Sequence, residues 1–212
     1  MGYGTYDNCE KQNAGVYNMT LLILECTPKQ DRGRQNKARE GMILFRFLTL
    51  PGLECLDIKL REFQNKKDII KFLHREKNVE GFEFVHMSGH GSVLDKHTAV
   101  FELSRGVMEA HEFPENCFWD QSVALSACTL GQTAFVDPFI KKTGPSEVIG
   151  PQREVPFTDA CAFWIPYYYL VLQEDLTPKN AFVKTKNFLK GRMTGSFQYW
   201  KSIEQNKIVT GE

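Results

Sequence analysis

The sequence predicts an α/β fold in which a mostly parallel central sheet has helices on both faces, a three-layer α/β/α sandwich. Short apolar segments alternate along the chain with segments whose apolar residues have helical spacing, and this order is typical of parallel sheets. Two of the apolar segments, Tyr17–Cys26 and Ser122–Ala127, are rich in aliphatic or small residues, which fits strands buried in a core.

Five segments have the signals of core strands. The first breaks at Thr27-Pro28, where a loop begins. The second partly alternates between apolar and charged residues, and the third follows a turn at Gly81. The expected strands are 17–26, 53–60, 82–88, 122–127 and 147–150.

Four segments have the spacing and the end signals of helices. Pro51-Gly52 terminates the first helix. Thr158 or Asp159 is expected to cap the third, which should kink at Pro166. Thr177-Pro178 combines a cap with a first-turn proline and opens the fourth. The expected helices are 34–50, 65–77, 159–172 and 177–191, and a hairpin or ribbon is expected over 98–113.

The size and charge of the chain limit its organisation and its partners. With 212 residues, 42% of them hydrophobic, it is long enough for one sizeable core, so we expect one domain over 17–205 between tails at 1–16 and 206–212. Twenty-six basic residues balance twenty-six acidic ones, so no net charge draws the protein to nucleic acid or to an anionic membrane. No apolar run approaches the roughly 20 residues that span a bilayer.

The cysteines indicate the redox compartment. All six stand singly, without a CxxC pair, and the polar N-terminus lacks a signal-sequence pattern. We therefore expect free thiols in a reducing compartment and a cytoplasmic protein. Cys26, Cys55, Cys117 and Cys161 are expected to be small buried side chains.

Two loops stand out where neighbouring strands are expected to end. Gly89-His90-Gly91 follows the third strand and Ala127-Cys128-Thr129 follows the fourth. Parallel sheets place their chemistry beyond the carboxyl ends of the strands, and adjacent strands lie about 4.8 Å apart. His90 can therefore take the proton of the Cys128 thiol, while the N–H groups of Gly91 and Cys128 can form an oxyanion hole. The sequence predicts a cysteine nucleophile with a histidine acid/base.

Other interpretations of these residues stay open. His86, four residues before His90 on the same strand, should face the same side; it supports the site, packs in the core or acts directly. A metal site of His86, His90 and Cys128 is conceivable, but the spacing matches no familiar zinc pattern, and we expect no metal. A backbone carbonyl is one candidate for the group that orients the His90 ring.

Both loops, with the strands before them, resemble the motifs of a known family. Val85–Ser92 is similar to the histidine motif of the CHAT domains, caspase-like proteins related to separases and more distantly to metacaspases and gingipains. Ala124–Gly131 is similar to the cysteine motif of that family, and the later segments follow in the family's order, so that the resemblance covers about residues 20–200. Either motif alone is weak, whereas the two in order are a strong joint signal.

The resemblance implies a caspase-like fold and a cysteine endopeptidase without a cofactor. It implies His90 and Cys128 as the dyad, with Gly91 and Cys128 as the oxyanion donors. Ser126 stands where caspases carry a glutamine and metacaspases an aspartate in the first specificity pocket, so that determinant is missing. Thr158-Asp159 resembles the separase segment whose aspartate faces a basic residue before the cleaved bond. Asp159 is thus either a pocket acid, which favours cleavage after Arg or Lys, or a helix cap.

The resemblance also implies partners. Family members often work as effectors in bacterial defence or programmed death, so we expect a protein substrate and an activating protein partner in another chain, without direct contact with nucleic acid or membrane. Two other classes stay open. One is an interaction module whose dyad is silent or waits for a partner, and the other is a non-proteolytic thiol hydrolase or acyltransferase.

Overall fold

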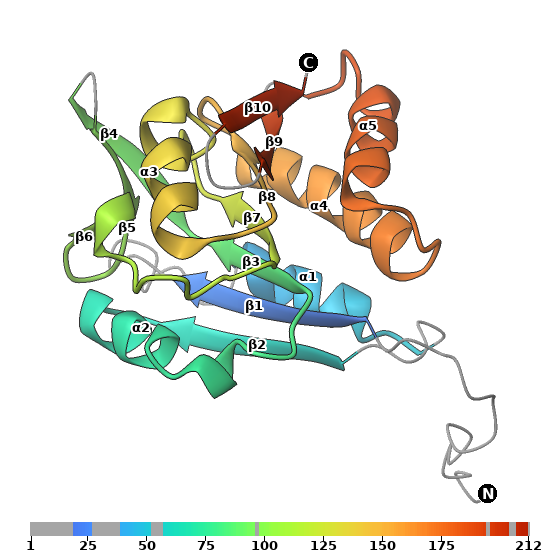
Figure 1. Cartoon of the computed structure of the whole chain (residues 1–212). Coiled ribbons are helices and arrows are strands. Elements are labelled where there is room, and N and C mark those ends of the chain that lie inside the picture. Colours follow the sequence, from blue (N-terminus) through green and yellow to red (C-terminus); the bar gives the residue numbers. More distant parts are fainter. Residues whose placement is uncertain are drawn as a thin grey trace, which may run out of the picture.

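The central sheet has seven strands in the order β10-β9-β8-β7-β3-β1-β2. The computed structural model describes residues 19–26, 39–51, 57–95, 98–193, 196–203 and 207–211. Strands β2, β1, β3, β7 and β8 are mutually parallel, and β9 and β10 run antiparallel to their neighbours. Helices lie on both faces of the sheet (Figure 1), which confirms the predicted three-layer fold class.

The five predicted core strands are all present, and each observed bound lies within four residues of the predicted one. The last segment of the chain adds two further strands to the sheet. Residues 206–212, expected to be a tail, contain one of them, which pairs with β9. The strands of the sheet are β1 (Thr20–Cys26), β2 (Asp57–Phe63), β3 (Phe84–Ser88), β7 (Ser122–Ser126), β8 (Glu147–Pro151), β9 (Phe197–Ile203) and β10 (Lys207–Gly211).

Five described α-helices cover the sheet, one more than the sequence predicts. The additional helix follows β7 and contains Pro138, and a polar run from Lys141 follows its apolar residues, so its sequence resembles a loop. Among the described helices, none combines the length and apolarity that crossing a bilayer requires. The helices are α1 (Glu40–Leu48), α2 (Lys66–Leu73), α3 (Thr133–Thr143), α4 (Phe157–Leu172) and α5 (Pro178–Phe188).

Strand side chains are buried on both faces of the sheet because they alternate between two hydrophobic clusters. In β1, Leu22 and Leu24 pack in the cluster that contains α2 and α3 residues. Leu21 and Ile23 pack on the opposite face with residues of α1, α4 and α5. Each is at most 1% exposed, and burying one such side chain contributes about 1.5–3 kcal/mol.

A three-stranded antiparallel ribbon projects beyond the end of β3. It consists of β4 (His90–Asp95), β5 (Thr98–Glu102) and β6 (Val107–Met108), in the order β4-β5-β6. Only Gly89 separates β3 from β4, so the chain continues past the sheet in nearly the same direction (Figure 1). The sequence predicts a loop at His90, whereas in the structure His90 begins this second strand.

The two predicted helix caps have different outcomes. α4 begins at Phe157, with Pro156 in the cap position and no side-chain cap, so the predicted cap at Thr158 or Asp159 is wrong: both lie within the first turn. The cap of α5 is confirmed, because the Thr177 side chain accepts the N–H of Asn180 at 3.4 Å.

Replacing Phe139 by alanine tests whether α3 belongs to the core. Phe139 is 0% exposed, and its ring lies 5.0, 5.8 and 5.6 Å from those of Phe113, Phe118 and Phe135. We expect Phe139→Ala to lower the free energy of unfolding by about 3–5 kcal/mol in urea titrations, because it leaves a cavity among packed rings. Phe188→Ala, at a residue 65% exposed, is the matched control and should cost less than about 1 kcal/mol. Equal losses would contradict the assignment.

Candidate active site

One set of paired residues across three strands positions the site. Glu25 of β1 pairs with Ser88 of β3, and Ser88 pairs with Ser126 of β7. These three residues therefore lie side by side across the sheet and form one rung. Ser88 and Ser126 are the last residues of their strands, and Glu25 is the last but one of β1. All three are buried and line one pocket, on the face that α1 and α4 cover. The Gly89 N–H donates to the Ser126 carbonyl at 3.1 Å and ties the two following loops together.

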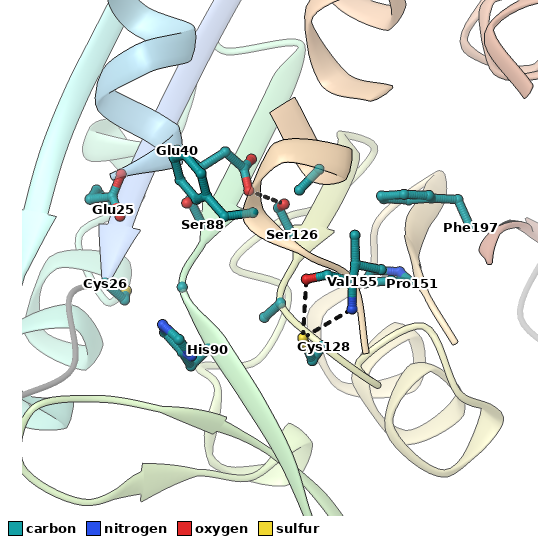
Figure 2. A pocket seen from close by; sticks show the side chains of 14 residues that line it. Glu25, Cys26, Glu40, Ser88, His90, Ser126, Cys128, Pro151, Val155 and Phe197 are labelled. Atoms are coloured by element: carbon teal, nitrogen blue, oxygen red, sulfur yellow. Dashed lines mark hydrogen bonds between the residues drawn. The ribbon is translucent and has the colours of Figure 1, made fainter. Parts of the chain in front are cut away.

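The two predicted catalytic residues follow this rung at equal distance along the chain. His90 lies two residues beyond Ser88, and Cys128 lies two residues beyond Ser126. Both line the same pocket (Figure 2), His90 as an exposed side chain and Cys128 as a half-buried one. The fold thus brings together the thiol and the imidazole that the sequence singles out.

The turn that carries Cys128 holds a strained backbone. Thr129 has φ 65°, in the left-handed region that β-branched residues rarely adopt. Its N–H donates to the Arg153 carbonyl at 3.4 Å, and the Gly131 N–H donates to the Pro151 carbonyl at 2.8 Å. The segment after β8 therefore braces a sharp strand-to-helix turn that presents the thiol.

Gly91 lets β4 approach this turn closely. A β-carbon placed at Gly91 would lie 2.1 Å from the carbonyl oxygen of Cys128, far inside van der Waals contact. Only glycine fits where the strand crosses the nucleophile loop. The oxyanion role of the Gly91 and Cys128 N–H groups stays a prediction.

Backbone contacts orient the Cys128 sulfur. The Val155 N–H donates to Sγ at 3.4 Å, and the thiol donates to the Val155 carbonyl at 3.8 Å (Figure 2). Val155 itself lines the pocket, so the sulfur lies against the pocket wall. Its direction is set by backbone groups of the loop between β8 and α4.

Three other cysteines have the environment of structural thiols. Cys26 is buried, and Cys117 and Cys161 are half-buried. Burial raises the pKa of Cys117 and of Cys161 to about 12, and it raises the pKa of Cys26 well above its ordinary value. These thiols stay protonated and unreactive at neutral pH. Cys55 lies outside the described residues.

Glu40 is a pocket residue that the sequence reasoning missed. It is the first residue of α1 and only 6% exposed. Its Oε1 lies 2.9 Å from His86 Nε2, and its Oε2 accepts the Ser126 hydroxyl at 2.6 Å. Ser126, which lacks the acidic or amide group of related pockets, instead positions a carboxylate that comes from another element. Within the sequence Glu40 looks like an ordinary charged residue near a helix start.

His86 supports this carboxylate from inside the core. It is 0% exposed, and its Nδ1 lies 3.1 Å from the Tyr168 hydroxyl. Burial raises the pKa of Tyr168 well above its ordinary value, so the hydroxyl keeps its proton, and both ring nitrogens of His86 have a hydrogen-bond partner. Trp164 packs edge-on against His86, with ring centroids 5.1 Å apart, and donates its indole N–H to Ser126 at 2.6 Å. Of the interpretations left open for His86, the structure favours the supporting one.

Glu25 adds a second buried carboxyl group at the same place. Burial, with a smaller contribution from the charge of Glu40, raises its pKa from 4.5 to about 7. The Met42 N–H donates to it at 3.2 Å, so Glu25 caps α1 in place of Arg39, whose side chain makes no cap bond. Arg39 is itself 2.5 Å from Glu62. Arg39 is thus paired elsewhere, and the floor of the pocket carries the two carboxyl groups of Glu25 and Glu40.

The pocket combines this acidic floor with apolar walls. Its volume is about 100 Å³. Asp159, the predicted pocket acid, is not among the described residues that line it; it lies in the first turn of α4. The apolar lining comes from the segment after β7, the end of β8 with the loop that follows it, the start of α4 and the start of β9, and consists of Ala127, Pro151, Val155, Phe157, Ala160 and Phe197.

Replacing Gly91 by alanine tests the close approach of β4 to the nucleophile loop. The added methyl group must displace the Cys128 carbonyl, so we expect the free energy of unfolding to fall by about 1–3 kcal/mol in urea titrations. Ser92→Ala, one residue further along β4, is the matched control and should change it by less than about 0.5 kcal/mol. A Gly91→Ala protein as stable as the control would refute the geometry.

The raised pKa of Glu25 predicts a pH-dependent stability. Between pH 4.5 and about 7 the folded protein holds a proton on this carboxyl that the unfolded chain has lost, so stability falls as pH rises through this window. Relative to Glu25→Gln, wild type should lose about 3 kcal/mol of unfolding free energy across it. Urea titrations at several pH values measure the difference, and Glu80→Gln, at an exposed site, is the control. Parallel profiles for wild type and Glu25→Gln would contradict the assignment.

Solved cysteine peptidases have a similar fold. The Arg-specific cysteine proteinase gingipain R matches with a TM-score of 0.51 and 13% identity over 82% of this chain. The complex of Porphyromonas gingivalis RgpB pro- and mature domains matches with a TM-score of 0.50 and 13% identity, also over 82%. The Drosophila initiator caspase Dronc matches with a TM-score of 0.49 and 15% identity over 89% of this chain and 81% of its own.

These matches are of fold only. The chain spans 42% and 44% of the two gingipain chains. The sequence matches no protein-family model and no curated protein. The similarity does not single out the CHAT domains. The chain therefore has an α/β fold similar to that of gingipain R, with a mostly parallel sheet flanked by helices.

Proposed function

We propose that the protein is a cysteine endopeptidase with Cys128 as nucleophile and His90 as acid/base. The observation that carries this proposal is that both side chains line one pocket at the carboxyl ends of β3 and β7. Two buried carboxyl groups, of Glu25 and Glu40, line the same pocket. The caspase-like fold supports it, because the similar proteins of known structure include cysteine proteinases.

The chemistry proceeds in two steps. The Cys128 sulfur attacks the carbonyl carbon of the scissile peptide bond, and as this C–N bond breaks, His90 transfers to the leaving amine the proton taken from the thiol. Water, deprotonated by His90, then hydrolyses the thioester, which releases the acid and restores the thiol. No cofactor enters either step.

We propose cleavage after arginine or lysine. An apolar passage that ends at a carboxylate suits a side chain with an alkyl stem and a cationic head. Glu40 is fixed by its contacts with His86 and Ser126, and it lines the end of this passage. The gingipain with the similar fold is described as Arg-specific, in line with this preference. The recognition acid is then Glu40, assisted by Glu25, in place of Asp159.

A peptide panel with Arg, Lys, Leu or Asp before a fluorogenic amide tests both parts. We expect wild type to cleave after Arg and Lys, and Cys128→Ala to abolish cleavage. Glu40→Gln keeps the shape and one of the two accepted hydrogen bonds but removes the charge, so it should lower kcat/KM for Arg and Lys by about 100-fold and leave that for Leu within about twofold. Asp159→Ala, the matched control, should change neither.

Several outcomes would contradict the proposal. A Cys128→Ala protein with wild-type melting and unchanged cleavage would refute the nucleophile. An Arg preference that survives Glu40→Gln but disappears in Asp159→Ala would restore the pocket predicted from the sequence. Turnover of small thioesters without peptide cleavage would favour a thiol hydrolase. The activating partner and a role in defence or cell death stay predictions.

A further inference from the structure

The strand of the ribbon nearest the site, β4, has one edge that no other described strand pairs with. Among the described strands β4 pairs with β5 alone, and it is the outer strand in the order β4-β5-β6. The outward N–H and C=O groups of such an edge can pair with an extended peptide.

The side chains along this edge are apolar and exposed on both sides. Val93 is 45% exposed and Leu94 is 58% exposed. Successive strand residues point to opposite faces, so each face of β4 carries a partly exposed aliphatic side chain at this point. Exposed aliphatic side chains on an edge strand are typical of a surface that another segment covers.

The edge is continuous with the catalytic residues. His90 is the first residue of β4, and Gly91 lies directly against the carbonyl of Cys128. In the proposed reaction His90 protonates the leaving amine, which belongs to the residue after the scissile bond. The residue before the bond occupies the pocket over Glu40, on the face that α1 and α4 cover. The chain after the bond therefore leaves past His90, where β4 begins.

We propose that the substrate segment following the scissile bond binds in extended form along the edge of β4, with apolar residues against Val93 and Leu94. This inference rests on the proposed peptidase function. It assigns a specificity surface on the leaving-group side of the bond, and it favours substrates with an extended apolar segment there over peptides that end at the bond. Because β4 already pairs with β5, only alternate residues of β4 turn their backbone N–H and C=O groups to the outer edge.

Two substrates with the same residues before the bond test the proposal. One carries a fluorogenic amine directly after Arg, and the other is an internally quenched peptide with six residues, rich in Val and Leu, after Arg. The double variant Val93→Ser/Leu94→Ser should lower kcat/KM about tenfold for the long peptide and less than twofold for the short one. Phe188→Ser, at another exposed apolar residue on α5, should change neither.

N-methylation of the long peptide tests strand pairing directly. Only alternate amides of a strand face its partner, so methylation should slow cleavage at every second position after the bond. Equal effects of the double variant on both substrates, or none on the long one, would overturn the proposal. Sedimentation that reveals a dimer of wild type but a monomer of the double variant would assign the edge to a second copy instead.

A binding measurement separates this inference from the proposed function. If wild type cleaves neither substrate, the peptidase proposal fails, and binding of the long peptide to Cys128→Ala protein then decides about β4. Tight binding that the double variant weakens about tenfold supports peptide binding along β4. Absence of binding, or equal binding to the double variant, overturns the proposal.

Discussion

The register of three parallel strands is the constraint on which the site depends. Because Glu25, Ser88 and Ser126 share one rung, the loops after β3 and β7 start level with each other and a carboxyl group starts beside them. Side chains alternate between the faces with a period of two, so a slip of one residue would turn Ser126 toward α3 and remove the hydroxyl that holds Glu40. Aliphatic residues buried on both faces of these strands fix that register against such a slip.

A polar network inside an apolar core has an energetic cost, which complete hydrogen bonding offsets here. Glu40 accepts from His86 and Ser126, Ser126 accepts from Trp164, and His86 contacts Tyr168. Removing one member of such a network leaves a buried polar group without a partner, which typically costs 1–3 kcal/mol. Glu25 differs, because its raised pKa leaves it close to half protonated near pH 7.

The sequence predicted the features that local patterns encode. Apolar runs revealed the five core strands, and the two motifs at their ends identified His90 and Cys128 at one sheet edge. It could not predict Glu40, because burial of this residue arises only when α1 packs over β1 and β3. The predicted cap at Thr158 or Asp159 was wrong for a similar reason: it depends on where α4 begins, and Pro156 in the cap position moves that start upstream. The proline in α3 concealed a helix that packing stabilises.

Two of the edge strands of the described β structure, β2 and β4, differ in character. β2 borders the main sheet, and its exposed residues Asp57, Lys59 and Arg61 alternate in sequence with half-buried aliphatic ones. Charges spaced in this way resist uncontrolled association, because another strand that docks there must desolvate or oppose each of them. At high concentration, this side of the molecule should therefore favour colloidal solubility, and strand-mediated assembly is restricted to edges without such protection.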